Sequence, residues 1–162
     1  MNYYLIGFMG AGKTTIGHEL ATLGLKHLDL DVYIQNQYQK IAAEIIEEEG
    51  IEQFRLYEQK CFFKVSQQDN YIISLGGGTI TIPEVAEYLQ KQKYVIYLEA
   101  DCPILYKRIQ QDINNVRPLA DSYVHFTSLF DSRKPLYDKL ATIKINANQN
   151  ISDTVAQIIQ VI

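Results

Sequence analysis

The segment that most constrains the fold of this chain is Gly7-Phe8-Met9-Gly10-Ala11-Gly12-Lys13-Thr14. It fits the pattern G-x-x-x-x-G-K-[ST]. The short apolar run at residues 3–6 before it predicts a buried strand, and residues 13–23 after it have the apolar spacing of a helix that ends at Gly24. Glycines let the backbone curl so that successive N–H groups point inward, and the helix N-terminus adds the positive end of its dipole. The sequence therefore predicts a strand, loop and helix that bind a nucleoside triphosphate.

The rest of the chain repeats the same alternation of strand and helix. Strands are predicted at residues 25–30, 71–75, 94–98 and 141–145. Helical patterns cover residues 32–64 with a break near Gly50, 83–92, 103–112, 126 to Pro135, and a last helix that Asn150 or Ser152 caps. The strands show little polar alternation, which is typical of strands covered on both faces. We expect an α/β fold with a five-stranded parallel sheet and helices on both faces.

Composition excludes several classes of protein. The chain has 162 residues and a net charge of −4, with a pI near 5.3, which argues against a surface that binds nucleic acid. No apolar run approaches the roughly 18 residues that a membrane span needs, and the N-terminus lacks the basic region of a signal peptide. Cys61 and Cys102 form neither a disulfide framework nor a metal cluster. We expect a cytoplasmic protein with reduced thiols, bound to neither nucleic acid nor membrane.

The glycine-rich loop assigns roles to the residues at its end. Lys13 would reach the β- and γ-phosphates, and the Thr14 hydroxyl would hold Mg²⁺. A strand-to-helix turn without a ligand is the alternative, but the flanking strand and helix favour a phosphate site. The predicted nucleotide-binding residues of this region are Gly10, Ala11, Gly12, Lys13, Thr14 and Thr15.

Two further strand ends carry residues suited to a ligand. Asp29 and Asp31 follow the second strand, and Gly76-Gly77-Gly78 follow the third. The carboxyl ends of parallel strands meet at one edge of a sheet, where ligands bind. One carboxylate could face the metal and the other a second substrate, although Asp31 could instead cap the next helix. Three glycines suit the close approach of a ligand to bare backbone, with a flexible turn as the alternative.

Arginine is scarce among the basic residues, which makes each arginine informative. Only four of the 15 basic residues are arginine: Arg55, Arg108, Arg117 and Arg133. The planar guanidinium binds a carboxylate or phosphate through two parallel hydrogen bonds. The arginines could bind a carboxylate or phosphate, or they could be distributed by chance on a solvated face. The motifs that contain them decide between these two interpretations.

Five motifs follow the phosphate loop in a fixed order along the chain. They are Asp29-Leu30-Asp31, Phe54-Arg55-Leu56-Tyr57-Glu58, Ser74-Leu75-Gly76-Gly77-Gly78, Arg117-Pro118-Leu119 and Arg133-Lys134-Pro135-Leu136-Tyr137. Together with the loop, this set resembles the shikimate kinases over essentially the whole chain. The loop alone is shared by many families, whereas the full set is far more specific.

The resemblance implies a P-loop kinase fold with a five-stranded parallel sheet and a small lid. It implies one domain over residues 1–162, with a substrate-binding helical segment at about 32–64 and the lid at about 112–124. The implied activity is phosphorylation of the 3-hydroxyl of shikimate with MgATP, in the pathway to chorismate and aromatic amino acids. ATP and shikimate are the implied partners, Mg²⁺ is the implied cofactor, and the expected state is a monomer.

The resemblance also assigns residues. Shikimate would contact Asp31, Arg55, Gly76, Gly77, Gly78 and Arg133. Arg117 would be the lid arginine that meets the ATP phosphates, and Arg108 and Asn150 would lie on the nucleotide side. Asp29 and Ser74 would join Thr14 at Mg²⁺, the first two through water. Lys13, Asp31 and Arg117 would carry the catalysis, with Asp31 orienting the attacking hydroxyl and accepting its proton.

The chain departs from the family at several positions. Ile51 replaces a common glutamate, Gln39 replaces a glycine, and the stretch between Arg117 and Arg133 is a few residues short. The adenine loop, which commonly carries an arginine, reads Asn148-Gln149-Asn150. None of these changes removes a residue that the chemistry needs.

Two other functions fit part of the pattern. Another small-metabolite kinase, similar to gluconate kinase, would share the fold but would not need Arg55 and Arg133 for a ring carboxylate. A non-catalytic nucleotide-binding module is the second alternative, although Lys13, Asp31 and Arg117 are all present.

Overall fold

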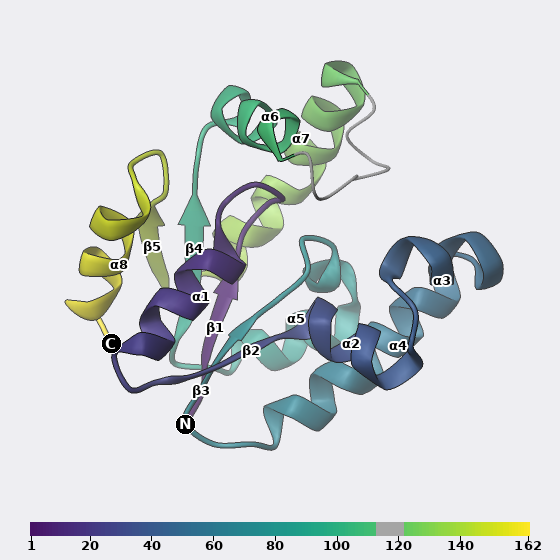
Figure 1. The fold of residues 1–162 in the computed structure, drawn as a ribbon, viewed down its shortest axis with the longest axis horizontal. Helices are drawn as coiled ribbons and strands as arrows, with labels where there is room; N and C mark the ends of the chain where they lie inside the picture. The colour runs from purple at the N-terminus through teal and green to yellow at the C-terminus, as the bar shows by residue number, and fades with distance from the viewer. Residues whose placement is uncertain (113–121) are drawn as a thin grey trace.

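Five parallel strands form the centre of the computed structural model, which describes residues 1–112 and 122–162 (Figure 1). The order across the sheet is β2-β3-β1-β4-β5, and every neighbouring pair is parallel. This confirms the predicted five-stranded parallel sheet. The strands are β1 (Tyr3–Ile6), β2 (Lys26–Asp29), β3 (Tyr71–Ser74), β4 (Val95–Glu99) and β5 (Ile143–Asn146).

Helices cover both faces of the sheet, as predicted. Helices α1 (Lys13–Thr22) and α8 (Ile151–Ile159) pack together on one face. Helices α4 (Ile51–Ser66), α5 (Pro83–Gln90) and α7 (Tyr123–Leu140) lie on the other. Helix α6 (Cys102–Gln111) contacts α7, while α2 (Leu30–Tyr38) and α3 (Ala42–Glu49) stand beside α4, away from the sheet (Figure 1). A 3₁₀ turn, η1 (Thr79–Thr81), follows β3. No helix in the described ranges is long and apolar enough to span a membrane.

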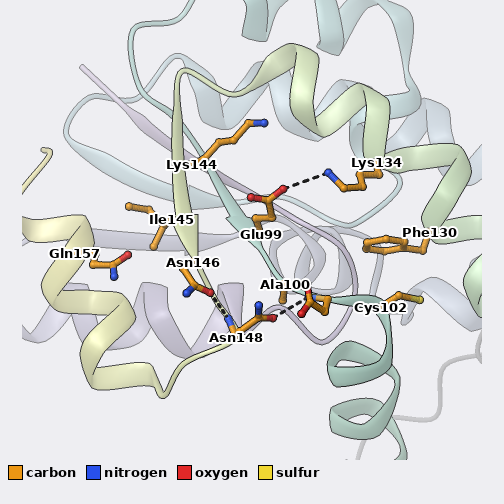
Figure 2. A pocket seen from close by; sticks show the side chains of 11 residues that line it. Glu99, Ala100, Cys102, Phe130, Lys134, Lys144, Ile145, Asn146, Asn148 and Gln157 are labelled. Carbon is orange, nitrogen blue, oxygen red and sulfur yellow. Dashed lines mark hydrogen bonds and ion pairs between the residues drawn. The ribbon is translucent and has the colours of Figure 1, made fainter.

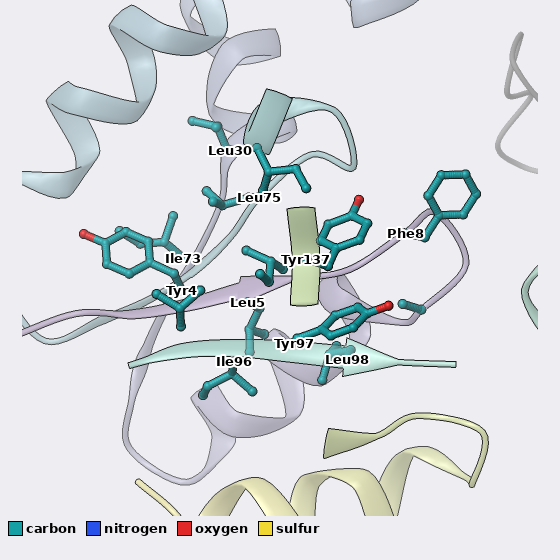
Figure 3. Packing of buried hydrophobic residues seen from close by; sticks show 14 of the residues in the cluster. Tyr4, Leu5, Phe8, Leu30, Ile73, Leu75, Ile96, Tyr97, Leu98 and Tyr137 are labelled. Carbon is teal, nitrogen blue, oxygen red and sulfur yellow. The ribbon is translucent and has the colours of Figure 1, made fainter. Parts of the chain in front are cut away.

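The core explains why the strands lack polar alternation. Leu5 in β1 lies between Ser74 in β3 and Ile96 in β4. Tyr4, Leu5 and Ile96 are almost fully buried, because helices cover the sheet on both sides (Figure 3). Burial of apolar surface on both faces is the main stabilising contribution to such a sheet.

The helical segment at 32–64 breaks twice rather than once. The predicted break at Gly50 is present, with φ at 87°. A second break follows α2, where Gln39 is left-handed at φ 58° and its N–H bonds to the Gln35 carbonyl. Glycine adopts this conformation without steric cost, which fits the glycine that the resemblance implies at this position. The pattern missed this break because glutamine gives no turn signal.

The prediction that the helix before Tyr137 ends at Pro135 is wrong. Helix α7 runs through Pro135 to Leu140. Proline removes one backbone hydrogen bond, but Tyr137 and Leu140 beyond it are buried in the core. Tertiary packing of these side chains therefore outweighs the local preference for a break.

Other boundaries shift by one to three residues, and α7 begins at Tyr123 instead of 126. Strand β4 begins at Val95, and β5 begins at Ile143, two residues later than predicted. Asn150 rather than Ser152 caps α8, since its Oδ1 accepts a hydrogen bond from the Asp153 N–H at 2.8 Å. Arg117 and most of the predicted lid at 112–124 lie outside the described residues, so the domain and lid assignments stay predictions.

Candidate active site

The loop between β1 and α1 has the geometry of a phosphate cradle. Gly10 and Gly12 are left-handed, with φ at 83° and 91°. A Cβ atom on Gly10 would lie 2.9 Å from the Leu105 carbonyl oxygen, so only glycine fits there. Gly12 is the N-cap of α1 and has no side chain to block the first N–H groups of that helix. These groups are the ones that bind an anion at a helix N-terminus.

Lys13 lies over this loop. Its Nζ donates hydrogen bonds to the carbonyl oxygens of Gly7 at 2.6 Å and Phe8 at 3.2 Å. The ammonium therefore sits at the cradle itself, where phosphate oxygens would meet it.

Oxygen ligands for a metal gather beside the start of α1. The Thr14 hydroxyl donates to Asp29 Oδ2 at 2.5 Å. Asp29 Oδ1 accepts from the N–H groups of Asp31 and Val32, so Asp29, and not Asp31, caps α2. The buried Ser74 hydroxyl donates to the Lys13 carbonyl at 3.2 Å, which ties β3 to the same place.

This arrangement fits Mg²⁺. Hydroxyl and carboxylate oxygens are the ligands it prefers, and Mg²⁺ usually takes one or two protein ligands together with water and phosphate oxygens. Within residues 1–112 and 122–162 there is no group of three or more His, Cys, Asp or Glu side chains that could hold a metal alone. The described residues therefore suit a metal that is bound jointly with a nucleotide.

Sequence analysis missed a histidine at this position. His27 Nε2 lies 2.9 Å from Ser74 Oγ, and the ring packs where a Cβ atom on Gly17 would lie. Burial, with a smaller contribution from the nearby His18, lowers the pKa of His27. Nothing in the residue pattern paired His27 with Ser74, because only the sheet register brings them together.

Arg55 lies flat against the glycine turn after β3. A Cβ atom on Gly78 would lie only 2.1 Å from Arg55 Nη2. Arg55 Nη1 forms a salt bridge with Glu58 Oε2, three residues further along α4, and Glu58 Oε1 accepts from the Thr79 hydroxyl at 2.7 Å. Phe54 is buried beside it. Glu58 is 1% exposed, so it holds the guanidinium from inside the protein.

Arg133 reaches the same turn from α7. Its side chain is only 7% exposed, and no described residue gives it a salt bridge or a hydrogen bond. A Cβ atom on Gly77 would lie 3.6 Å from Arg133 Nη1 and from the Tyr137 hydroxyl. Burial, together with the charge of Arg55, lowers the pKa of Arg133. A nearly buried cation of this kind requires an anion to complete it.

Asp31 lies at the first glycine of the turn after β3. A Cβ atom on Gly76 would lie 2.9 Å from Asp31 Oδ1 and 3.0 Å from Glu58 Oε1. Gly76 is therefore required for these carboxylates to approach the turn. The structure brings Asp31, Arg55 and Arg133 together at the glycine turn.

Arg108 connects the phosphate loop to the loop before α8. Its guanidinium donates to the Gly10 carbonyl at 3.4 Å and the Gln149 carbonyl at 3.3 Å. Asn150 is adjacent, but its side chain caps α8 and bonds to Asp153. Arg108 therefore lies at the phosphate loop, whereas the Asn150 side chain is occupied by the cap of α8.

A separate cavity of about 560 Å³ lies at the ends of β4 and β5 (Figure 2). None of the residues predicted to bind either substrate lines it. Lys134 pairs there with Glu99 at 3.2 Å and with Asp138 at 2.9 Å, and Lys144 pairs with Asp138 at 2.5 Å. The two lysines and the two carboxylates of these pairs neutralise one another. The candidate active site therefore remains at the phosphate loop and the glycine turn, and not at this cavity.

The sheet order, the phosphate loop and the cationic turn beside it define a P-loop kinase. The profile of the shikimate kinase family matches residues 9–162. The chain belongs to the shikimate kinase family. It is 36% identical over 162 residues to the shikimate kinase of Streptococcus gordonii, covering 99% of each chain.

Solved structures agree with this assignment. The shikimate kinase of Acinetobacter baumannii in complex with shikimate has a TM-score of 0.90 and 34% identity, with 98% of this chain and 90% of that chain covered. A gluconokinase of Sinorhizobium meliloti has a TM-score of 0.67 at 12% identity, covering 96% and 87% of the two chains. The latter likeness shows the shared fold alone and gives no support to gluconate as the substrate.

Proposed function

We propose that this chain transfers the γ-phosphoryl group of ATP to the 3-hydroxyl of shikimate, which gives shikimate 3-phosphate. The observation that carries the proposal is Arg133, a residue that is 7% exposed and whose guanidinium forms no salt bridge or hydrogen bond with a described residue. Shikimate carries a carboxylate that would complete this cation. The relative of known structure with shikimate bound supports the same substrate.

Arg55 and Arg133 supply the acceptor site. They come from α4 and α7, and each lies within contact distance of a Cβ position on the turn at 77–78. Two guanidinium groups from separate helices can hold one carboxylate through charge-assisted hydrogen bonds, each worth about 1.5–3 kcal/mol. This clamp would fix the ring so that its 3-hydroxyl faces the nucleotide.

Phosphoryl transfer depends mainly on positioning and on stabilising the transferred charge. Lys13 and the N–H groups at the start of α1 would bind the β- and γ-phosphates. Asp31 would orient the attacking hydroxyl and accept its proton. The role of Arg117 at the phosphates rests on the family resemblance, because this residue lies outside the described ranges.

Thr14, Asp29 and Ser74 would hold Mg²⁺ with the nucleotide. When bound, the ion neutralises phosphate charge during transfer.

We further propose that the enzyme acts as a monomer in the cytoplasm. The free thiols of Cys61 and Cys102 support a reducing compartment.

Release of ADP in a coupled assay tests the proposed function. We expect rapid release with shikimate and only background release with gluconate or without an acceptor. The substitution Arg133→Lys keeps the charge but loses the planar fork, so the KM for shikimate should rise at least tenfold, about 1.4 kcal/mol, with the KM for ATP nearly unchanged. Release with gluconate and not with shikimate would reject the proposal. An effect of Arg133→Lys on ATP alone would reject the assignment of this arginine.

A further inference from the structure

Phe8 touches both halves of the site. Its carbonyl oxygen accepts hydrogen bonds from Lys13 Nζ at 3.2 Å and from the Ala11 N–H at 3.2 Å. Its ring belongs to the buried hydrophobic cluster, and the residue is 1% exposed (Figure 3). The loop pattern leaves this position open to any residue, so no motif assigns a role to it.

The guanidinium of Arg133 lies over the Phe8 ring. The distance from Arg133 Cζ to the ring centroid is 5.8 Å, within the range of a cation–π contact. Phe126 and Phe130 hold the Phe8 ring from α7, with their centroids at 5.0 Å and 5.4 Å and near-perpendicular planes. Phe8 is therefore fixed in place, and its face is turned towards the arginine.

Tyr137 lies near the same glycine turn as Arg133, since both are 3.6 Å from a Cβ position on Gly77. Tyr137, one turn further along α7, donates its hydroxyl to the Gly77 carbonyl at 2.6 Å and stacks on Tyr97 at 5.1 Å (Figure 3). These contacts hold the glycine turn and α7 together. With no described hydrogen-bond partner, Arg133 takes its position from the Phe8 ring and from this packing.

We propose that Phe8 is a positioning residue for the acceptor site: its ring holds the Arg133 guanidinium in place for the substrate carboxylate. The inference rests on the proposed function, because it assumes that Arg133 binds that carboxylate. It adds a specificity role for a residue of the phosphate loop that does not itself contact the acceptor. The same residue thereby fixes the phosphate loop relative to the carboxylate clamp.

A purely structural role for Phe8 makes a different prediction. Loss of packing would weaken the loop and would reduce activity with every acceptor alike. Loss of the cation–π contact would reduce only the preference for an acceptor with a carboxylate. The decisive quantity is the ratio of kcat/KM for shikimate to kcat/KM for an analogue with a hydroxymethyl group in place of the carboxylate.

The experiment replaces Phe8 by pentafluorophenylalanine through suppression of a stop codon at that position. The fluorinated ring keeps nearly the same shape but reverses the quadrupole that attracts a cation. The same replacement at Phe62, which is fully buried and packs on Tyr4 and Tyr88, is the control. Phe8→Leu, which removes the ring face altogether, is a second variant should the fluorinated protein fail to fold.

We expect the ratio to fall about three- to thirtyfold when Phe8 is changed and to stay within twofold of wild type in the Phe62 control. The KM for ATP should be unchanged. The positioning role of Phe8 would be overturned by an unchanged ratio in both Phe8 variants or by an equal fall of the ratio in the control. In either case, shikimate-dependent ADP release by the wild type would still uphold the proposed function. Absence of that release in the wild type would reject the proposed function and this inference together.

Discussion

Adding a single methyl group at Gly78 tests the geometry of the acceptor site directly. Gly78 has φ −99° and ψ −10°, a conformation that alanine also adopts, so the change brings no backbone strain. The added Cβ would lie 2.1 Å from Arg55 Nη2, whereas ordinary contact begins at 3.4 Å. The difference, 3.4 − 2.1, means that this nitrogen must retreat by about 1.3 Å.

The displaced atom belongs to the end of a flexible, partly exposed side chain, so Gly78→Ala should fold. A misplacement of about 1 Å in a positioning group costs roughly a hundredfold in rate. We therefore expect kcat/KM for shikimate to fall about 10- to 100-fold, with the KM for ATP within twofold of wild type. Steady-state kinetics measure both, and thermal unfolding confirms that the variant is folded.

A double-mutant cycle shows whether the arginine transmits the effect. In an Arg55→Ala background the atom that collides with the new methyl group is absent. Gly78→Ala should then cause little further loss. An equal loss in both backgrounds would refute the reasoning, because the methyl group would then act on the substrate or the turn itself.

The remaining predictions concern catalysis and stability. Lys13→Met should lower the rate of ADP release with shikimate by about a thousandfold or more, since the Lys13 ammonium lies on the phosphate loop. Retention of a tenth of the activity would contradict the assignment of Lys13 to the ATP phosphates. Gln39→Gly should raise the free energy of unfolding by about 0.5–1 kcal/mol and the melting temperature by about 1–4 °C, because glycine adopts the left-handed conformation of residue 39 without steric cost. A lower melting temperature would show that the contacts of the Gln39 side chain contribute more to stability than this steric cost. Hydrogen bonds from Lys144 and Lys134 lower the pKa of Asp138, so its contribution to stability is present above its ordinary pKa near 4 and is lost as the pH falls through the folded value. Urea unfolding should show Asp138→Asn less stable than wild type by up to about 1 kcal/mol at pH 7, with the gap closing towards pH 3; a gap that is the same at both pH values would exclude this linkage.

The sequence alone was sufficient for the features that depend on local geometry. The phosphate loop requires glycines where the backbone is left-handed and a helix directly after them. One continuous stretch of the sequence specifies both the glycines and the helix. The salt bridge between Arg55 and Glu58 follows from three-residue spacing on one helix. Buried strands are recognisable because a parallel sheet needs apolar residues on both faces.

Tertiary structure decided what depends on residues far apart in the chain. Pro135 stays inside α7 because Tyr137 and Leu140 are anchored in the core, and α2 ends at Gln39 without a local signal. The lack of a partner for Arg133 among the described residues, and its contact with Phe8, cannot be read from spacing, since 125 positions separate the two. Local patterns report backbone preference and periodicity, whereas the burial and pairing of a charged side chain depend on which distant groups the folded chain places around it.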